Sequence, residues 1–189
     1  AAVGAVASGA AGFGALMLMG LLFGLLGDVW LDLKYVHREQ DVPYTFAGFW
    51  SFAVGHAFFI AALLSSYADF SRPLYFILPV VIATAVGIGN VSLGPKMKLD
   101  YGRFAGITRF YGSILFSMTL ISGALAMMHG FNITTLNMIF IGGVLFIISD
   151  LVLSGTYFGK GHEKPVDIIL NYIFYYGAQF VIALSVAFA

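Results

Sequence analysis

The run GGVLFIISDLVLS, residues 142–154, decides the class of this protein because it places one charged side chain, Asp150, among apolar residues on both sides. It lies in a longer apolar segment, 133–155, which as an α-helix is long enough to cross the bilayer hydrocarbon core of about 30 Å. A carboxylate inside such a segment is costly unless it has partners or a task. The run therefore predicts a membrane-spanning helix that carries a functional acidic residue.

The composition of the whole chain supports a membrane protein. Hydrophobic residues make up 60% of the chain and charged residues 10%, against about 45–50% and about 25% in soluble domains. Nine Lys and Arg balance nine Asp and Glu, so the charge gives no argument for a nucleic-acid partner. The chain has no Cys, which excludes disulfides, thiolate nucleophiles and cysteine metal sites.

Six apolar segments of membrane-spanning length follow one another, separated by short polar connectors. Their predicted bounds are 3–27, 45–66, 74–93, 104–128, 133–155 and 166–188. They are continuously apolar, whereas strands of a membrane barrel would alternate over about ten residues. We therefore expect an all-α fold, a polytopic transmembrane helical bundle of six helices that forms a single domain over residues 1–189.

The basic residues predict how the bundle is oriented. The first, third and fifth connectors hold most of them, namely Lys34, Arg38, Lys96, Lys98, Arg103, Lys160 and Lys164, with Arg109 close by. The second and fourth connectors hold only Arg72. By the positive-inside rule, the odd-numbered connectors are expected to be cytoplasmic. The expected location is a bacterial cytoplasmic membrane or a eukaryotic endomembrane.

Two carboxylates are expected at the same depth. Asp28 precedes Lys34 by six residues and Asp150 precedes Gly155 by five, which places each roughly 7–9 Å inside the cytoplasmic boundary at 1.5 Å per residue. Asp32, one turn beyond Asp28, is expected to be solvated. The matched depth predicts that Asp28 and Asp150 face one another across a cavity open to the cytoplasmic side.

Further polar residues fall at a similar level and are expected to line the same cavity. In the last segment Tyr172, Tyr176 and Gln179 follow i, i+4, i+7 spacing along one face. The full set of candidate binding or supporting residues is His56, Asn90, Arg109, Tyr111, Asn171, Tyr172, Tyr175, Tyr176 and Gln179.

Each of these residues also has a purely structural interpretation. Asp28 can cap a helix or reach interfacial water, His56 can be a packing histidine, and the Tyr and Gln side chains can hydrogen-bond between helices. Neither H-x-x-x-H nor H-E-x-x-H spacing occurs in the chain, so no metal site is expected. No cofactor is expected either.

Five stretches resemble, in order and spacing, the YhhN-type lysoplasmalogenase family. They are residues 21–31, LLFGLLGDVWL; 46–63, FAGFWSFAVGHAFFIAAL; 111–118, YGSILFSM; 142–154, GGVLFIISDLVLS; and 171–185, NYIFYYGAQFVIALS. The family's signature positions map onto Gly27-Asp28, His56, Ser149-Asp150, and Tyr175, Tyr176, Ala178 and Gln179. Family members have about eight transmembrane helices, whereas hydropathy predicts six in this chain.

The resemblance implies an enzyme, a hydrolase that cleaves the vinyl ether bond of lysoplasmalogens to a fatty aldehyde and a glycerophospho-ethanolamine or -choline. Protonation of the vinyl β-carbon gives an oxocarbenium-like cation that water captures, and this chemistry needs one protonated and one ionised carboxyl group. Asp150 is assigned as the acid and Asp28 as the base, and the two roles can be exchanged. His56, Tyr176 and Gln179 would hydrogen-bond the carboxylates or the substrate. Lys96, Lys98 or Arg109 would hold the lipid phosphate.

Two other functions remain open at this point. A small proton-coupled transporter or channel would use the same Asp and His residues as a relay, and a non-catalytic lipid-binding protein would have a headgroup pocket without close carboxylates. An enzyme for an amphiphile needs a cavity that is closed beyond His56, whereas a transporter needs a path to the other face. The expected partners are a lysophospholipid substrate and membrane lipid, and the oligomeric state and headgroup preference are left open.

Overall fold

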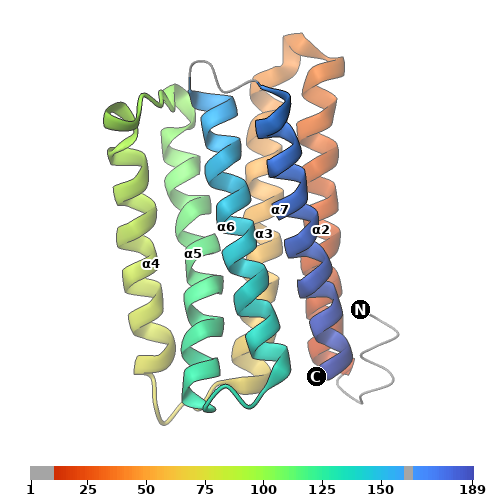
Figure 1. Cartoon of the computed structure of the whole chain (residues 1–189), viewed down its shortest axis with the longest axis vertical. Coiled ribbons are helices and arrows are strands. Elements are labelled where there is room, and N and C mark those ends of the chain that lie inside the picture. The colour runs from red at the N-terminus through yellow and green to blue at the C-terminus, as the bar shows by residue number, and fades with distance from the viewer. Residues whose placement is uncertain (1–10, 160–163) are drawn as a thin grey trace.

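The computed structural model describes residues 11–159 and 164–189, which form a bundle of six helices, each long and apolar enough to cross a membrane (Figure 1). The helices are α2 (Ala11–Val36), α3 (Asp41–Tyr67), α4 (Leu74–Ser92), α5 (Ala105–Met128), α6 (Thr134–Phe158) and α7 (Pro165–Ser185). The first part of the predicted segment 3–27 and the predicted cytoplasmic Lys160 lie outside the described residues. The all-α transmembrane fold is confirmed.

The predicted bounds agree closely with the helices except in α2, which continues to Val36, past both Asp28 and Asp32. Hydropathy marks where apolar side chains stop, but a helical backbone continues as long as its own hydrogen bonds and packing are favourable. As a consequence Asp28 and Asp32 lie one turn apart on a continuous helix, not at the start of a connector.

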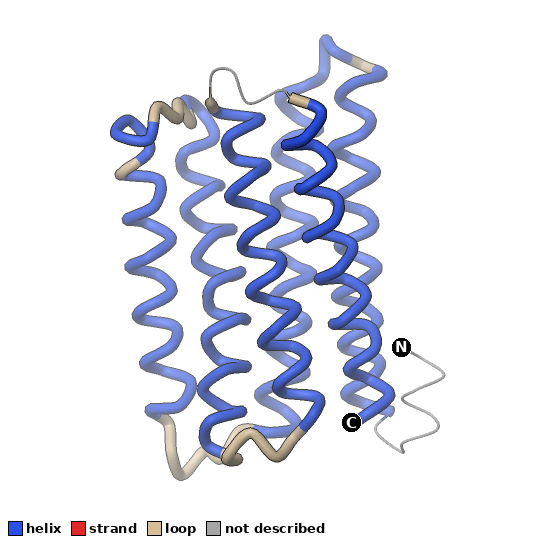
Figure 2. The backbone as a smooth tube through the Cα atoms, viewed as in Figure 1, coloured by secondary structure: helices blue, strands red, loops and turns tan. Residues whose placement is uncertain are grey.

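Consecutive helices run antiparallel and pack mainly as three pairs, α2 with α3, α4 with α5 and α6 with α7. Contacts of α5 with both α3 and α6 join the pairs. At one end of the bundle, short loops connect α3 to α4 and α5 to α6 (Figure 2), as expected for antiparallel neighbours.

One end of the bundle, drawn at the top of Figure 1, carries the connectors after α2 and α4 and the end of α6. We call it the basic end because Arg38, Lys96, Lys98 and Arg103 lie in these connectors. The opposite end, with residues 68–73 and 129–133, is called the far end.

The long connector between α4 and α5 is tied to the end of α6. It winds through two 3₁₀ turns, η2 (Gly94–Met97) and η3 (Gly102–Phe104), with Lys98 in the left-handed region at φ 61°. The Asp100 amide donates to the Phe158 carbonyl at 2.8 Å, and the ring centroids of Tyr101 and Phe158 are 4.6 Å apart. Val91, Leu99 and Tyr101 form a small buried cluster there.

The far half of the bundle is filled by apolar side chains. Those buried almost completely are Met17, Phe59, Leu63, Met118, Ile121, Leu125, Leu136, Ile139 and Ile182. They come from α2, α3, α5, α6 and α7, so five helices share one core. Two polar side chains within this half, Thr119 and Ser122, donate to carbonyls of their own helix, and Thr135 of α6 donates to the Ser185 carbonyl of α7, which satisfies these hydroxyls without water.

Candidate active site

A cavity of about 380 Å³ lies in the half of the bundle nearest the basic end. Every described helix contributes to its lining, and its walls are mainly apolar and aromatic with a few polar groups. Val91 and Phe158 line it on the side of the basic end, whereas Phe52, Leu115 and Phe146 line it where the apolar core begins. Mainly apolar walls with a few convergent polar groups are typical of a ligand site.

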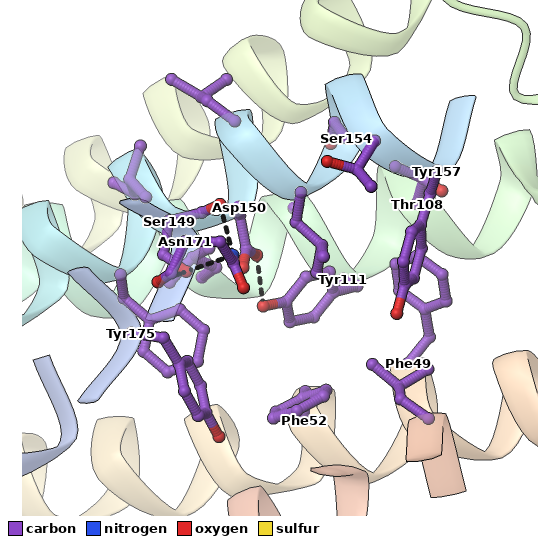
Figure 3. Close-up of a pocket in the computed structure, with 18 of the residues that line it drawn as sticks. Phe49, Phe52, Thr108, Tyr111, Ser149, Asp150, Ser154, Tyr157, Asn171 and Tyr175 are labelled. Atoms are coloured by element: carbon purple, nitrogen blue, oxygen red, sulfur yellow. Dashed lines mark hydrogen bonds between the residues drawn. The ribbon is translucent and has the colours of Figure 1, made fainter. Parts of the chain in front are cut away.

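Asp150, on α6, is held by a tyrosine of α5 (Figure 3). The Tyr111 hydroxyl donates to Asp150 Oδ2 at 2.5 Å, a short distance that is typical of a hydrogen bond with a carboxylate. Tyr111 is 6% exposed, so the bond lies away from bulk water. Both residues line the cavity.

Asp28, on α2, is held in the same way by a tyrosine of α7. The Tyr175 hydroxyl donates to Asp28 Oδ2 at 2.7 Å and accepts from Gln179 Nε2 at 3.1 Å. Asp28 and Tyr175 also line the cavity. The two carboxyl groups predicted from matched depth therefore face one cavity, from helices on two different sides of it.

The ring of Phe52, on α3, stands between the two tyrosines (Figure 3). Its centroid is 6.2 Å from the Tyr111 ring and 6.3 Å from the Tyr175 ring. The glycine before Asp28 makes this position possible, because a Cβ at Gly27 would lie 2.8 Å from the Phe52 ring. Gly27 thus leaves room for the Phe52 ring, which contacts the rings of both tyrosines that bind the carboxyl groups.

A polar clamp next to Asp150 joins α6 to α7. The Asn171 amide donates to the Ser149 carbonyl at 3.0 Å and to its hydroxyl at 2.9 Å, and the Ser149 hydroxyl donates to the Asn171 carbonyl at 3.3 Å. These bonds, in which each of the two residues is a donor, fix the rotation of α6 at the residue before Asp150. Asn171 thus lines the cavity, as predicted.

The prediction that His56 lines the cavity is wrong, because His56 lies behind the cavity wall. Its Nδ1 donates to the Phe52 carbonyl at 2.8 Å, and its ring packs edge-on against Phe146 at 4.7 Å and near Tyr111 at 5.8 Å. His56 is one turn farther along α3 than Phe52, so Phe52 and Phe146 separate it from the open space. Its Nε2 is buried without a hydrogen-bond partner.

Of the face of α7 predicted to line the cavity, Tyr172 and Tyr176 line it at its mouth and Gln179 does not, while Tyr175 lines it from a more buried position. Tyr175, Ala178 and Ile182 are buried, whereas Tyr172 and Tyr176 are 49% and 60% exposed and stack on each other at the cavity mouth with centroids 5.7 Å apart. Gln179 supports Tyr175 but does not line the cavity. The small side chain of Ala178 indicates in the sequence which face of α7 packs inward, because a small residue lets α7 approach α6.

The basic residues predicted to hold a lipid phosphate do not line the cavity. Lys96 and Lys98 are exposed on the connector after α4, and Arg109 is half-buried on α5 beside the lining residue Thr108. The connector is bound to the end of α6 through its backbone, which turns these lysine side chains outward. Asn90, on α4, does line the cavity.

Several lining residues were not among the predicted candidates. Asp32 is exposed, in agreement with the solvation expected for it, and it also lines the mouth of the cavity. Tyr35, Thr108, Ser154 and Tyr157 line it as well. Asp32 and Tyr35 follow Asp28 at i+4 and i+7, a spacing that would have placed all three on one face if α2 had been predicted to continue.

No group of three or more His, Asp or Glu side chains that could hold a metal ion occurs within residues 11–159 and 164–189. In that same part of the chain, the described cavity lining does not reach into the core of the far half. The arrangement thus offers two tyrosine-bound carboxyl groups in an apolar chamber.

Comparison with known proteins gives one match. The model of the YhhN family matches residues 1–186, a range that includes both carboxyl residues and both tyrosines that bind them. No curated protein matches the chain, and no solved structure does.

Proposed function

Because the chain belongs to the YhhN family, which is known as a family of lysoplasmalogenases, we propose that it is a membrane hydrolase that cleaves the vinyl ether bond of lysoplasmalogens. The observation that carries this proposal is the pair of carboxyl groups, Asp28 and Asp150, each bound by a tyrosine and facing one apolar cavity. Two carboxyl groups with different protonation states are what acid–base cleavage of such a bond needs.

In the proposed reaction Asp150, in its protonated form, gives its proton to the β-carbon of the vinyl ether, and the double-bond electrons form the new C–H bond. The resulting oxocarbenium cation is stabilised by ionised Asp28, which removes a proton from the attacking water. The hemiacetal then breaks to a fatty aldehyde and a glycerol hydroxyl. In this collapse the hemiacetal hydroxyl gives its proton to Asp150 and the leaving glycerol oxygen takes the proton held by Asp28, so both carboxyl groups return to their starting states and only water and the lipid are consumed.

The surroundings of the two carboxyl groups support this assignment of roles. Tyr111 occupies one oxygen of Asp150 and leaves the other for a proton. Asp28 lies on the same face of α2 as the exposed Asp32, on the side from which water reaches the cavity. The apolar walls suit an alkenyl chain and limit competing reactions of the cation.

A proton-coupled transporter with the same carboxylates has less support. A relay needs polar groups or water along the whole path, but beyond Phe146 and His56 the described bundle is packed with apolar side chains. Liposomes that contain the protein are therefore expected to show the same proton flux as protein-free liposomes under an imposed pH gradient.

The experiment that tests the hydrolase uses the purified full chain with a lysoplasmalogen in D₂O, with the aldehyde trapped as a hydrazone for mass spectrometry. Protonation of the β-carbon is expected to place one deuterium on the carbon next to the aldehyde. A saturated ether analogue and a 1-acyl lysophospholipid are the matched controls and should not be cleaved. Absence of aldehyde release, or release without deuterium in the fatty chain, would contradict the proposal.

A further inference from the structure

A second cavity, of about 640 Å³, lies at the basic end and adjoins the first. The two cavities share four lining residues, Tyr35, Thr156, Tyr157 and Phe158. The second is further lined by the charged residues Lys34, Arg38 and Asp41, together with Thr45 and Phe104. The two cavities therefore lie on either side of a wall made by these four residues, and the chamber beyond that wall is charged.

Two basic side chains, Lys34 and Arg38, line this chamber and give it a positive charge. Lys34 Nζ lies 3.4 Å from the centroid of the Tyr157 ring, so a cation–π contact holds it at the wall shared with the first cavity. The ion pairs between described residues join His37 to Glu39 and Arg72 to Asp69, and neither involves Lys34 or Arg38. With Asp41 the chamber carries one net positive charge, which matches a phosphodiester monoanion better than a dianionic phosphate.

The chamber also lies at the level of the membrane where lipid phosphates occur. Trp30 and Tyr44 stack with centroids 5.7 Å apart just below it, and such aromatic residues are typical of the membrane–water interface. Lys34 lies one turn of α2 beyond Trp30, on the side of the basic end. Basic side chains at this level bind anionic lipid groups.

The distance from the carboxylates fits one lysophospholipid. Lys34 follows Asp28 by six residues, a rise of about 9 Å along α2, and its flexible stem reaches back toward the shared wall. In a lysophospholipid the glycerol carries the ether oxygen on one terminal carbon and the phosphate on the other. With the ether group between Asp28 and Asp150, an extended glycerol that points toward the basic end brings the phosphate to the side of the cavity where Lys34 lies.

We propose that Lys34 and Arg38 bind the phosphodiester of the lysophospholipid whose ether bond lies between the two carboxyl groups. The assignment rests on the proposed function for the identity of the lipid. It replaces Lys96, Lys98 and Arg109 as phosphate ligands, because those three residues line neither cavity. Lys34 binds through its ammonium, and Arg38 offers the planar donor pair that suits two phosphate oxygens.

The test measures binding, with ligands that cannot be cleaved, so that it does not depend on hydrolysis. Equilibrium binding of a radiolabelled 1-O-alkyl lysophospholipid, whose ether is saturated, is compared with that of the 1-O-alkylglycerol that lacks the phosphate. The purified full chain is compared with Lys34→Met, with Arg38→Gln and with the double variant. Lys98→Met is the matched control, since it removes an exposed charge from the same end.

The double variant is expected to bind the phosphodiester ligand on the order of 10²-fold more weakly, because two charge-assisted hydrogen bonds are lost. Its affinity for the alkylglycerol, and the affinity of Lys98→Met for both ligands, should change by less than about threefold. Glycerophosphoethanolamine is expected to displace the labelled lipid at lower concentration than inorganic phosphate. More effective displacement by inorganic phosphate would contradict the assignment to a lipid phosphodiester.

Equal weakening for the two ligands, or an equal effect of Lys98→Met, would overturn the proposal. Arg38→Gln alone keeps the test decisive if Lys34→Met does not fold, because Arg38 is exposed. The outcomes separate this site from the proposed function. Phosphate-dependent binding without aldehyde release contradicts only the hydrolase, whereas aldehyde release with phosphate-independent binding contradicts only this site.

Discussion

Each carboxyl group of the cavity is paired with a phenol from a different helix, Asp150 with Tyr111 and Asp28 with Tyr175. A carboxyl group in an apolar environment is costly when it has no partner, and the phenol supplies a donor without adding charge. Each tyrosine thereby determines which oxygen of its aspartate remains available to a ligand.

Replacing either carboxyl group with its amide is expected to reduce catalysis strongly. Asp28→Asn and Asp150→Asn should each lower the rate of aldehyde release by on the order of 10² or more, because the amide keeps the size of the side chain but removes its acid–base function. The double variant should lose much less than the product of the two losses. Rates are measured by mass spectrometry of trapped aldehyde.

The matched control for this prediction is Asp69→Asn at the far end. Asp69 lies in an exposed turn, where its carboxylate accepts from the Ser71 amide and hydroxyl, and asparagine can accept the same bonds. Its rate should equal that of the parent chain. Parental rates in well-folded Asp28 or Asp150 variants would rule out the two-carboxylate mechanism.

Removing one phenol hydroxyl tests whether the tyrosines position the carboxyl groups. Tyr111→Phe and Tyr175→Phe should each slow aldehyde release by roughly tenfold to a hundredfold, since hydrogen bonds to charged groups contribute about 1.5–3 kcal/mol and about 1.4 kcal/mol is a factor of ten. Tyr67→Phe, at the far end of α3, keeps its ring contact with Phe13 and serves as the control. If all three variants keep the parental rate, the hydroxyls have no positioning role.

At the scale of elements, small residues determine how closely helices approach the cavity. Gly87 of α4 faces α5, where an added Cβ would lie 2.7 Å from the Ser113 backbone nitrogen and 3.0 Å from its Cα. A backbone cannot give way as a side chain can, so this glycine sets the distance between α4 and α5. The same helix carries Asn90 and Val91 into the cavity.

Two glycines of α4 therefore give opposite predictions. Gly87→Ala is expected to destabilise the protein by about 1–3 kcal/mol through overpacking and to reduce activity by moving α4 away from the cavity. Gly89→Ala meets nothing within 4 Å and should be neutral or stabilising by up to about 1 kcal/mol, since alanine favours helix. Thermal unfolding in detergent measures both, and a Gly87→Ala variant as stable as Gly89→Ala would refute the close approach.

At the scale of the whole molecule, the two cavities lie toward the basic end, while the far half is a packed apolar core. Because both cavities lie toward one end, the orientation of the bundle in the membrane determines which leaflet supplies the substrate. If the basic end is cytoplasmic, as the distribution of Lys and Arg predicts, the site takes its substrate from the cytoplasmic leaflet.

Because the chain has no Cys, single cysteines can report this orientation. A membrane-impermeant maleimide should label Ser71→Cys in intact cells but should label Lys98→Cys only after the membrane is permeabilised. Both positions are exposed, and they lie at opposite ends of the bundle. The cysteine-free parent chain gives the background. Labelling of Lys98→Cys alone in intact cells would reverse the orientation.

Hydropathy and helical rise were enough to predict the membrane class, the six helices and the lining of one cavity by both Asp28 and Asp150. These are properties of position along the chain, because apolar length sets the number of spans and the helical rise sets depth. The contribution of Asn90, Tyr111, Asn171 and Tyr175 to one cavity also followed from depth.

The rotation of each helix about its axis, and the helices that it contacts, could be read from the folded bundle but not from the sequence. The packing of the helices buries Tyr175 and leaves Tyr172 and Tyr176 at the cavity mouth, and it puts His56 behind Phe52 and Phe146. It also brings Lys34 and Arg38, not Lys96 and Lys98, next to the carboxylate cavity. Helices that are apolar on all sides carry little sequence signal for which face meets a neighbour. Close contacts between helices determine which face packs inward, and such contacts pair residues far apart in the chain, for example Gly27 with Phe52.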